Sequence, residues 1–185
     1  EAYLDVSGSL SLFGGDEAIA MHIKKRIREE LVLPCTIAIA SNKLIAKVAT
    51  EFAKPDGYTS VPNGAEAEFL RPLPIRKLPG AGPRTCESLE RMGIRTIGDL
   101  ACIPQENLMR TIGSSALSLQ RAAKGISTSE VTPHGVSKSI SRETTFETDL
   151  TDWERIERVG IHLAERAVHA LREEGLHCKC VGLKI

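Results

Sequence analysis

The 185-residue sequence has no long apolar run, no net charge and no framework of paired cysteines. A membrane-spanning helix needs roughly 18 unbroken apolar residues, and the opening residues, EAYLDVSGSL, lack the basic and then apolar layout of a secretory signal. The five cysteines are odd in number, which favours reduced thiols over a disulfide framework. These absences predict a cytoplasmic protein without a membrane partner.

The charge balance does not exclude any class of binding partner. Lys and Arg together number 24, as do Asp and Glu, so the formal net charge is zero. A local basic patch can still bind nucleic acid while acidic residues elsewhere cancel the sum. The sequence begins at Glu1 without a methionine and ends at VGLKI without a closing signal, from which we expect a piece cut at both ends.

The first 70 residues alternate strand and helix patterns. We expect a strand in EAYLDV, a helix from Asp16, a strand in CTIAIA, a helix capped by Ser41 and a strand in YTSV. The helix after Ser41 should end at Pro55, because the residue before a proline avoids helical geometry. This order is that of an α/β layer.

The remainder divides into an all-helical middle and a mixed end. Prolines after Arg71 mark a boundary, and four short helices follow, over Pro83 to Met92, Ile97 to Ala101, Gln105 to Ile112 and Ser115 to Lys124. After a polar linker over 126–136, we expect a strand in SKSISRETTF, a long helix from Trp153 to Glu173 and a strand in HCKCVGLKI. The fold class is therefore α+β in several units.

The stretch KLPGAGPRTCESLERMGIRTIGDL carries a Gly-x-Gly turn directly before a predicted helix. A Walker loop needs a second glycine followed by Lys and Ser or Thr, which this stretch lacks. A dinucleotide fingerprint needs a preceding parallel strand and a third glycine, and Thr85 occupies that third place. The pattern favours a helix-hairpin-helix motif, in which a tight turn joins a short helix to the helix from Pro83.

The chemistry of this hairpin suits the backbone of DNA. With Gly82 near the helix cap and Pro83 at the first helical position, free backbone amides lie at the positive end of the helix dipole. The amides expected to be free are those of Ala81, Gly82, Arg84 and Thr85. Because Gly80 and Gly82 lack side chains, a phosphodiester can approach closely, which gives binding that ignores base sequence and weakens with salt. The alternative is that the glycines only connect two packed helices.

The sequence resembles the Y-family translesion DNA polymerases, and most of all the bacterial DNA polymerase IV type, in four motifs. In chain order they are EAYLDV, ASNKLIAKVATEFAKPDG, LPIRKLPGAGPRTCESLERMGIRTIGDLA and KSISRETTF. The resemblance implies an incomplete enzyme with a partial α/β palm over 1–70, an all-α helix-hairpin-helix thumb over 71–125 and a partial β-α-β little finger over 137–185. It implies template-directed DNA synthesis across damaged bases, with primer-template DNA and a deoxynucleoside triphosphate as partners. Contact with a sliding clamp is left open.

The resemblance also implies the site residues. Glu1 matches the glutamate of an Asp-Glu pair that, with another aspartate, positions two Mg²⁺ ions in this family, which gives Glu1 a catalytic and metal-binding role. Lys54 matches a lysine that reaches the triphosphate of the incoming nucleotide. The hairpin is implied to hold the primer backbone. Residues implied to face the template phosphates are Lys138, Ser139, Ser141 and Arg142.

The resemblance also implies that the 185 residues alone do not polymerise DNA. Asp5 is not expected to replace the missing aspartate, because four residues of strand would separate it from Glu1 by roughly 13 Å. The alternative from another class is a non-catalytic DNA-binding repair module that uses the hairpin alone. Lys54 could also bind only the carbonyl groups at its helix end.

Three further features are interpreted as structural. The basic run of Lys24, Lys25, Arg26 and Arg28 is read as a solvated helix surface. His177, Cys178 and Cys180 are not expected to bind zinc, which prefers two residues between paired cysteines. Trp153 is expected to lie in the core.

Overall fold

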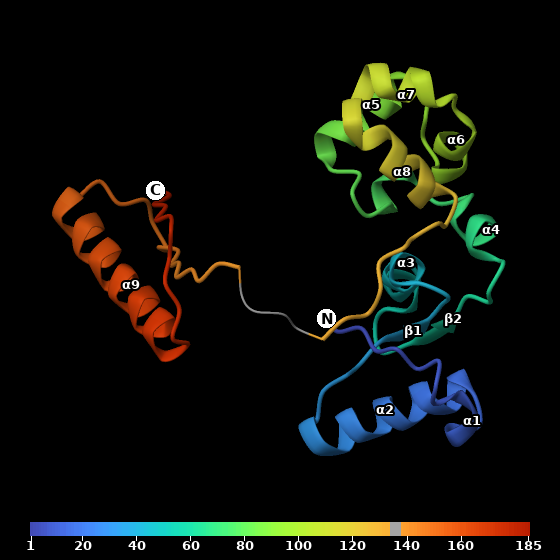
Figure 1. The fold of residues 1–185 in the computed structure, drawn as a ribbon, viewed down its shortest axis with the longest axis horizontal. Helices are drawn as coiled ribbons and strands as arrows, with labels where there is room; N and C mark the ends of the chain where they lie inside the picture. The colour runs from blue at the N-terminus through green and yellow to red at the C-terminus, as the bar shows by residue number, and fades with distance from the viewer. Residues whose placement is uncertain (134–137) are drawn as a thin grey trace. The chain divides into compact units, whose positions relative to one another are not determined.

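The computed structural model describes residues 1–133 and 138–185, and the chain divides into two compact units, Glu1–Val131 and Thr132–Ile185 (Figure 1). The first unit contains, in order, α1 (Leu10–Phe13), α2 (Asp16–Leu31), β1 (Ile37–Ile39), α3 (Lys43–Ala53), β2 (Tyr58–Ser60), α4 (Glu66–Leu70), the 3-10 turn η1 (Ile75–Lys77), α5 (Pro83–Arg91), α6 (Ile97–Cys102), α7 (Gln105–Ile112), the 3-10 turn η2 (Gly113–Ser115) and α8 (Ala116–Ala123). The second unit contains α9 (Trp153–Glu173). Helices with a small sheet match the predicted α+β class.

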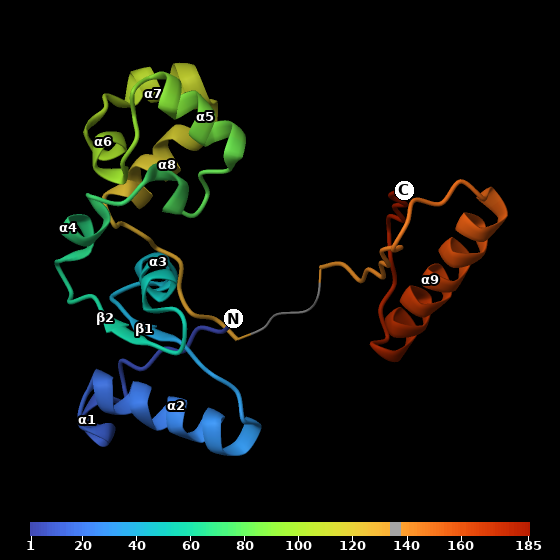
Figure 2. The same cartoon turned by 180° about the vertical axis from the view of Figure 1, so that it is seen from behind.

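The sheet consists of β1 and β2, which run parallel with Ile37 opposite Tyr58. Parallel strands need a crossover connection, and α3 supplies it. Figures 1 and 2 show α3 on one side of the strands and α2 on the other. The buried side chains of α3 are Ile45, Val48 and Ala49. The predicted cap of this helix was wrong by one residue, because Asn42 and not Ser41 accepts a hydrogen bond from the Ile45 amide, at 3.1 Å.

The helical part of the first unit was predicted closely, and all four short helices are confirmed to within one residue at each end. Their shared core includes Leu89, Leu100 and Leu108, which are fully buried. The segment before the hairpin joins the turn before α6 by backbone hydrogen bonds, Ile75 to Arg95 at 2.9 Å and Ile97 to Leu73 at 2.8 Å. The hairpin is thereby fixed to the helices that follow it.

Three predicted strands were wrong. Residues 1–6, 138–146 and 177–185 form no strand, and β1 and β2 are the only strands among the residues that the structure describes. An alternating pattern gives a strand only where a neighbouring strand supplies hydrogen bonds, and these segments have no such neighbour within the described chain. Large apolar side chains in two of these segments remain exposed: Leu4 is 66% exposed and Val181 is 87% exposed.

The second unit is built on α9, whose bounds match the prediction. Asp152 caps it by accepting a hydrogen bond from the Arg155 amide at 3.2 Å. The expected core position of Trp153 was wrong, because this side chain is 64% exposed. The side chains of the apolar stripe of α9 are not buried in a core, since no residue of the helix is fully buried.

Candidate nucleic-acid and nucleotide site

The hairpin before α5 has the geometry that its glycines predict. The Ala81 amide donates to the Leu78 carbonyl at 3.0 Å and closes the turn, while Gly80 adopts the left-handed conformation with φ of 94°. Gly82 is extended, with φ −68° and ψ 169°, and is the N-cap of α5, and Pro83 occupies the first turn. The chain therefore enters α5 with bare backbone at its positive end.

Three of the four amides expected to be free are free of protein acceptors. Within residues 1–133 and 138–185, no hydrogen bond is formed by the N–H groups of Gly82, Arg84 and Thr85. The expectation for Ala81 was wrong, because its amide closes the turn. The first helical bond runs from the Cys86 amide to the Gly82 carbonyl at 2.9 Å. The donors left at this end are those that an anion could use.

The two glycines differ in what the fold requires of them. Gly80 needs its missing side chain because of its left-handed backbone, which L residues rarely adopt. A Cβ at Gly82 would meet no atom within 4 Å, and the φ of Gly82 is ordinary. The fold therefore has no need of glycine at position 82, and its bare backbone leaves room for a group that approaches from outside.

The two arginines beside the hairpin differ in whether they are available for a ligand. Arg84 is exposed and forms no ion pair with the described residues. Arg76 is occupied, since its guanidinium donates to both carboxylate oxygens of Glu90 at 2.8 and 2.9 Å. That pair holds the pKa of Glu90 below its ordinary value.

Lys54 ends α3 and begins the turn that leads to β2. Its ammonium group pairs with Glu51 one turn earlier on the same helix, and both side chains are about half exposed. The hydrogen bond from Lys54 is also the main cause that lowers the pKa of Glu51. Lys54 is thus at the surface, and a phosphate group that binds it would have to displace the Glu51 carboxylate.

The turn after Lys54 is tied to α2 by a network that the sequence analysis missed. Lys24 Nζ donates to the Asp56 carbonyl at 2.7 Å and to Asp56 Oδ1 at 2.8 Å, and it also contacts the Cys35 carbonyl. Arg28 pairs with the second carboxylate oxygen of Asp56. The interpretation of the basic run as solvated surface was therefore wrong for Lys24, whose side chain is 17% exposed, but it holds for Arg28, which is 63% exposed although it pairs with Asp56. Their spacing of four residues, which puts both on one face of a helix, was the available signal.

Glu1 lies beside α3. Lys47 Nζ contacts both carboxylate oxygens of Glu1, at 2.8 and 3.0 Å, and the Tyr3 hydroxyl donates to one of them at 2.8 Å. The Lys43 ammonium lies 5.2 Å from the centre of the Tyr3 ring. The Lys47 bond is the main cause that lowers the pKa of Glu1, followed by the Tyr3 bond.

The residues present do not by themselves fit a pair of Mg²⁺ ions. In the described ranges, His, Cys, Asp and Glu side chains form no cluster of three or more that could hold a metal ion. Glu1 is one carboxylate with a lysine as its nearest charged partner. Cys178 and Cys180 are free and exposed.

The residues predicted to face the template lie in the second unit. Lys138, Ser139, Ser141 and Arg142 are exposed in an irregular segment, and the Arg142 guanidinium donates to the Ser141 carbonyl at 2.8 Å. Ile140 is half-buried. The structure describes these four residues within their own unit, and their role remains a prediction.

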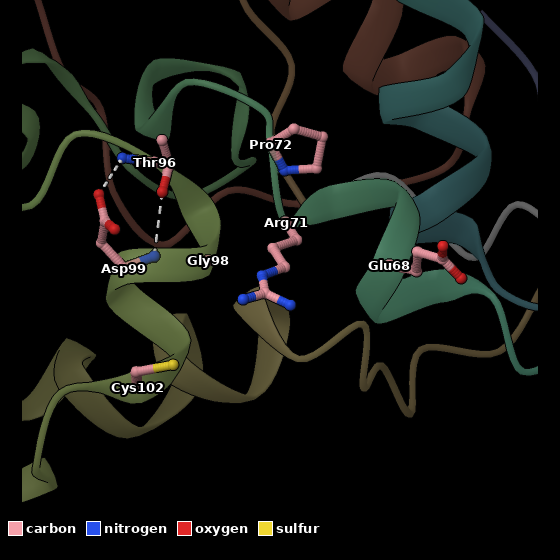
Figure 3. A pocket seen from close by; sticks show the side chains of 7 residues that line it. All are labelled: Glu68, Arg71, Pro72, Thr96, Gly98, Asp99 and Cys102. Carbon is pink, nitrogen blue, oxygen red and sulfur yellow. Dashed lines mark hydrogen bonds between the residues drawn. The ribbon is translucent and has the colours of Figure 1, made fainter.

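A cavity of about 400 Å³ opens between α4 and α6 (Figure 3). Its lining residues are Glu68, Arg71, Pro72, Thr96, Gly98, Asp99 and Cys102. None of the predicted site residues lines it. Thr96 and Asp99 are engaged in the cap of α6, shown by the two dashed lines in Figure 3.

Sequence comparisons show that the chain is similar to one family of proteins. Residues 1–51 match the impB/mucB/samB family, and residues 137–185 match the C-terminal domain of that family. The chain is 43% identical over 185 residues to a DNA polymerase IV of Dehalococcoides mccartyi, covering 100% of this chain and 47% of that protein. It is 40% identical to a DNA polymerase IV of Methanoculleus marisnigri, covering 100% and 51%. The chain spans about half the length of these curated relatives.

Solved structures show the same likeness. A Y-family DNA polymerase chimera matches with a TM-score of 0.76 at 26% identity, covering 90% of this chain and 48% of the chimera. The insertion ternary complex of Dbh DNA polymerase matches with a TM-score of 0.63 at 28% identity, covering 69% of this chain and 38% of that chain. The α+β arrangement described above is therefore shared with these structures.

No described helix combines the length and apolar character needed to cross a membrane.

Proposed function

We infer the function of this chain from its membership of the Y family of DNA polymerases, in which it stands with the DNA polymerase IV proteins. Residues 1–185 are, on this proposal, part of an enzyme that copies damaged DNA templates. The chain supplies a partial palm over 1–70, the thumb over 71–125 and part of the little finger from 137 onward. Its location is cytoplasmic, in keeping with five cysteines that are all free.

The observation that carries the proposal is the hairpin at Gly82. Its amide and those of Arg84 and Thr85 are free, and the fold does not require glycine there. A helix start of this kind binds a phosphate through backbone donors and the helix dipole. We assign the primer backbone to Gly80, Gly82, Arg84 and Thr85, with Ala81 closing the turn that presents them.

The incoming nucleotide is assigned to a different element. Lys54 is an exposed cation at the end of α3, and a mobile ammonium group can neutralise charge on the β and γ phosphates. Glu1 is proposed as a carboxylate ligand for Mg²⁺, with the other ligands lying outside residues 1–185. A bound metal ion would neutralise charge on the transferring phosphate. The template contacts of Lys138, Ser139, Ser141 and Arg142 complete the proposal, and a sliding-clamp contact has no assigned residue.

The test is a DNA-binding measurement on the 185-residue chain. Gly82→Asp places a carboxylate where the phosphate would lie, and Gly8→Asp adds the same charge at another open, exposed position. We expect Gly82→Asp to weaken binding at least about tenfold for every duplex sequence, because backbone contacts carry no sequence information. Gly8→Asp should bind like the parent chain.

Two outcomes would contradict the assignment. If Gly82→Asp binds DNA as tightly as Gly8→Asp, the hairpin is only a connection between helices. If the loss is confined to one DNA sequence, recognition is through bases and not through the backbone.

A further inference from the structure

We propose that Lys24 is a positioning residue that fixes the turn after α3, so that Lys54 is presented to the triphosphate of the incoming nucleotide. This inference rests on the proposed function, in which Lys54 binds that triphosphate. Lys24 does not touch Lys54. It acts through the backbone of residues 55–57, which joins Lys54 to β2.

The Lys24 ammonium group joins α2 to two other segments of the chain by hydrogen bonds. Its acceptors are the carbonyl oxygens of Cys35, Asp56 and Gly57 and the carboxylate of Asp56, with Gly57 at 3.4 Å. The Lys24 side chain is only 17% exposed. An ammonium group has three donors, and each can find an oxygen from a segment that is distant in sequence. A solvated surface lysine makes no such set of bonds.

The Asp56 carboxylate accepts further bonds in the same network. Its Oδ1 accepts a hydrogen bond from the Cys35 amide at 3.2 Å, and its other oxygen pairs with Arg28. Asp56 itself adopts the left-handed conformation, with φ of 48°. A non-glycine residue holds that conformation where its surroundings impose it. The contacts with Lys24 and Cys35 are the surroundings that do so.

The other end of the turn is equally constrained. The Gly57 carbonyl accepts the first hydrogen bond of the sheet, from the Ile37 amide at 3.1 Å. A Cβ on Gly57 would lie 2.0 Å from the Ala53 carbonyl oxygen, so the turn packs directly on the end of α3. With residues 56 and 57 fixed, Lys54 leaves the helix in one direction. Among the residues that the structure describes, only Glu51 pairs with its side chain, at the surface.

In this arrangement, hydrogen bonds hold the backbone of residues 56 and 57, whereas the Lys54 side chain extends from it at the surface. Holding a binding group in its bound position improves affinity because less order has to be imposed on binding, so fixing the turn has a functional consequence beyond stability. The chain meets the requirement by tying the turn to α2, which carries none of the assigned nucleotide ligands.

The experiment uses the full-length polymerase and steady-state primer extension. We expect Lys24→Met to raise KM for the nucleotide about tenfold with a change in kcat of less than about twofold. The affinity for primer-template DNA should not change. Lys25→Met is the matched control, because Lys25 is the next residue of α2, is exposed and, in the described part of the chain, pairs with Glu29 alone. It should behave like the parent enzyme.

A double-mutant cycle identifies the route of the effect. In a Lys54→Ala background, Lys24→Met should raise KM no further, because the cation that it positions is gone. If Lys24→Met prevents folding, Arg28→Gln removes only the outer contact to Asp56 and should give a smaller rise in KM, of about two- to threefold.

The contrary results are distinct. A parallel loss of kcat, DNA affinity and Tm without a rise in KM, or an undiminished effect in the Lys54→Ala background, would show that Lys24 only stabilises the fold. Extension that neither Lys24→Met nor Arg28→Gln affects would overturn this inference and leave the proposed function standing. Absence of extension by the parent enzyme would overturn both.

Discussion

At the residue scale, Asp56 is a carboxylate held by hydrogen bonds or ion pairs from Lys24, Cys35 and Arg28. Its pKa is lowered from the ordinary value of 3.8, first by the hydrogen bond from Lys24, then by the Cys35 amide, with Arg28 adding a favourable charge. A group whose pKa is lower in the folded than in the unfolded chain stabilises the fold above the unfolded pKa. That contribution is lost as the pH falls through the folded value, which lies below 3.8.

We therefore expect Asp56→Asn to be less stable than the parent chain at neutral pH, and the difference to shrink as the pH falls below 3.8. The measurement is Tm by circular dichroism on both proteins over this range. Asp149→Asn, at an exposed position without an ion pair in the described part of the chain, is the control. A difference between Asp56→Asn and the parent that stays constant down to the lowest pH would contradict the network described for Asp56.

Glu51 forms an ion pair with Lys54, the cation that we assign to the nucleotide. A surface pair of this kind contributes little to stability but competes with any anion that needs the lysine. We expect Glu51→Gln to lower KM for the nucleotide about twofold in the full-length polymerase, since Lys54 is then free before the substrate arrives. Glu29→Gln, which removes an exposed carboxylate from α2, should leave KM unchanged. A rise in KM for Glu51→Gln would mean that Glu51 helps to hold Lys54 in place.

At the scale of elements, the caps of the helices carry measurable stability. The Asp99 amide donates to Thr96 Oγ1 at 3.0 Å, and the Thr96 amide donates to Asp99 Oδ2 at 2.8 Å, which completes a capping box at the start of α6. We expect Thr96→Ala to lower the free energy of unfolding by about 1 kcal/mol, because the Asp99 amide loses its partner. Urea denaturation gives this value. Thr128→Ala, at an exposed position after α8, should change it by less than about 0.5 kcal/mol, and equal losses in both would argue against the cap.

Local signals explain which elements could be predicted. The helices α5 to α8 lie between glycines, prolines and caps, such as Gly82 before Pro83, so their bounds follow from short stretches of sequence. The predicted strand in residues 1–6 depends on a partner that no local pattern specifies. The same distinction holds for the site. The free amides at Gly82 follow from local helix geometry, whereas the bonds between Lys24 and Asp56 join residues 32 positions apart.

At the scale of the whole molecule, the chain contains the elements that we propose to hold DNA, but among its described residues only Glu1 is proposed to take part in the chemistry. The hairpin and the Lys54 turn both lie in the first unit, Glu1–Val131, and the predicted template contacts lie in the second. Relatives named DNA polymerase IV are about twice as long. The proposed assignments predict that DNA binding and catalysis depend on different parts of the polypeptide, and the 185 residues alone can test this.

We expect residues 1–185 to bind primer-template DNA without extending the primer. Among the described residues, Glu1 is the one carboxylate assigned to metal binding, its charge is matched by Lys47, and no cluster of three metal-binding side chains is present. Two-metal transfer needs several ligands around both ions, which one carboxylate cannot supply. The measurement is primer extension on an undamaged template with Mg²⁺ and all four nucleotides, with a full-length DNA polymerase IV as the positive control and a binding assay on the same sample. Template-directed extension by the 185 residues, at any enzyme concentration that also shows binding, would mean that the chain holds a complete catalytic centre and that the assignment of Glu1 as an isolated ligand is wrong.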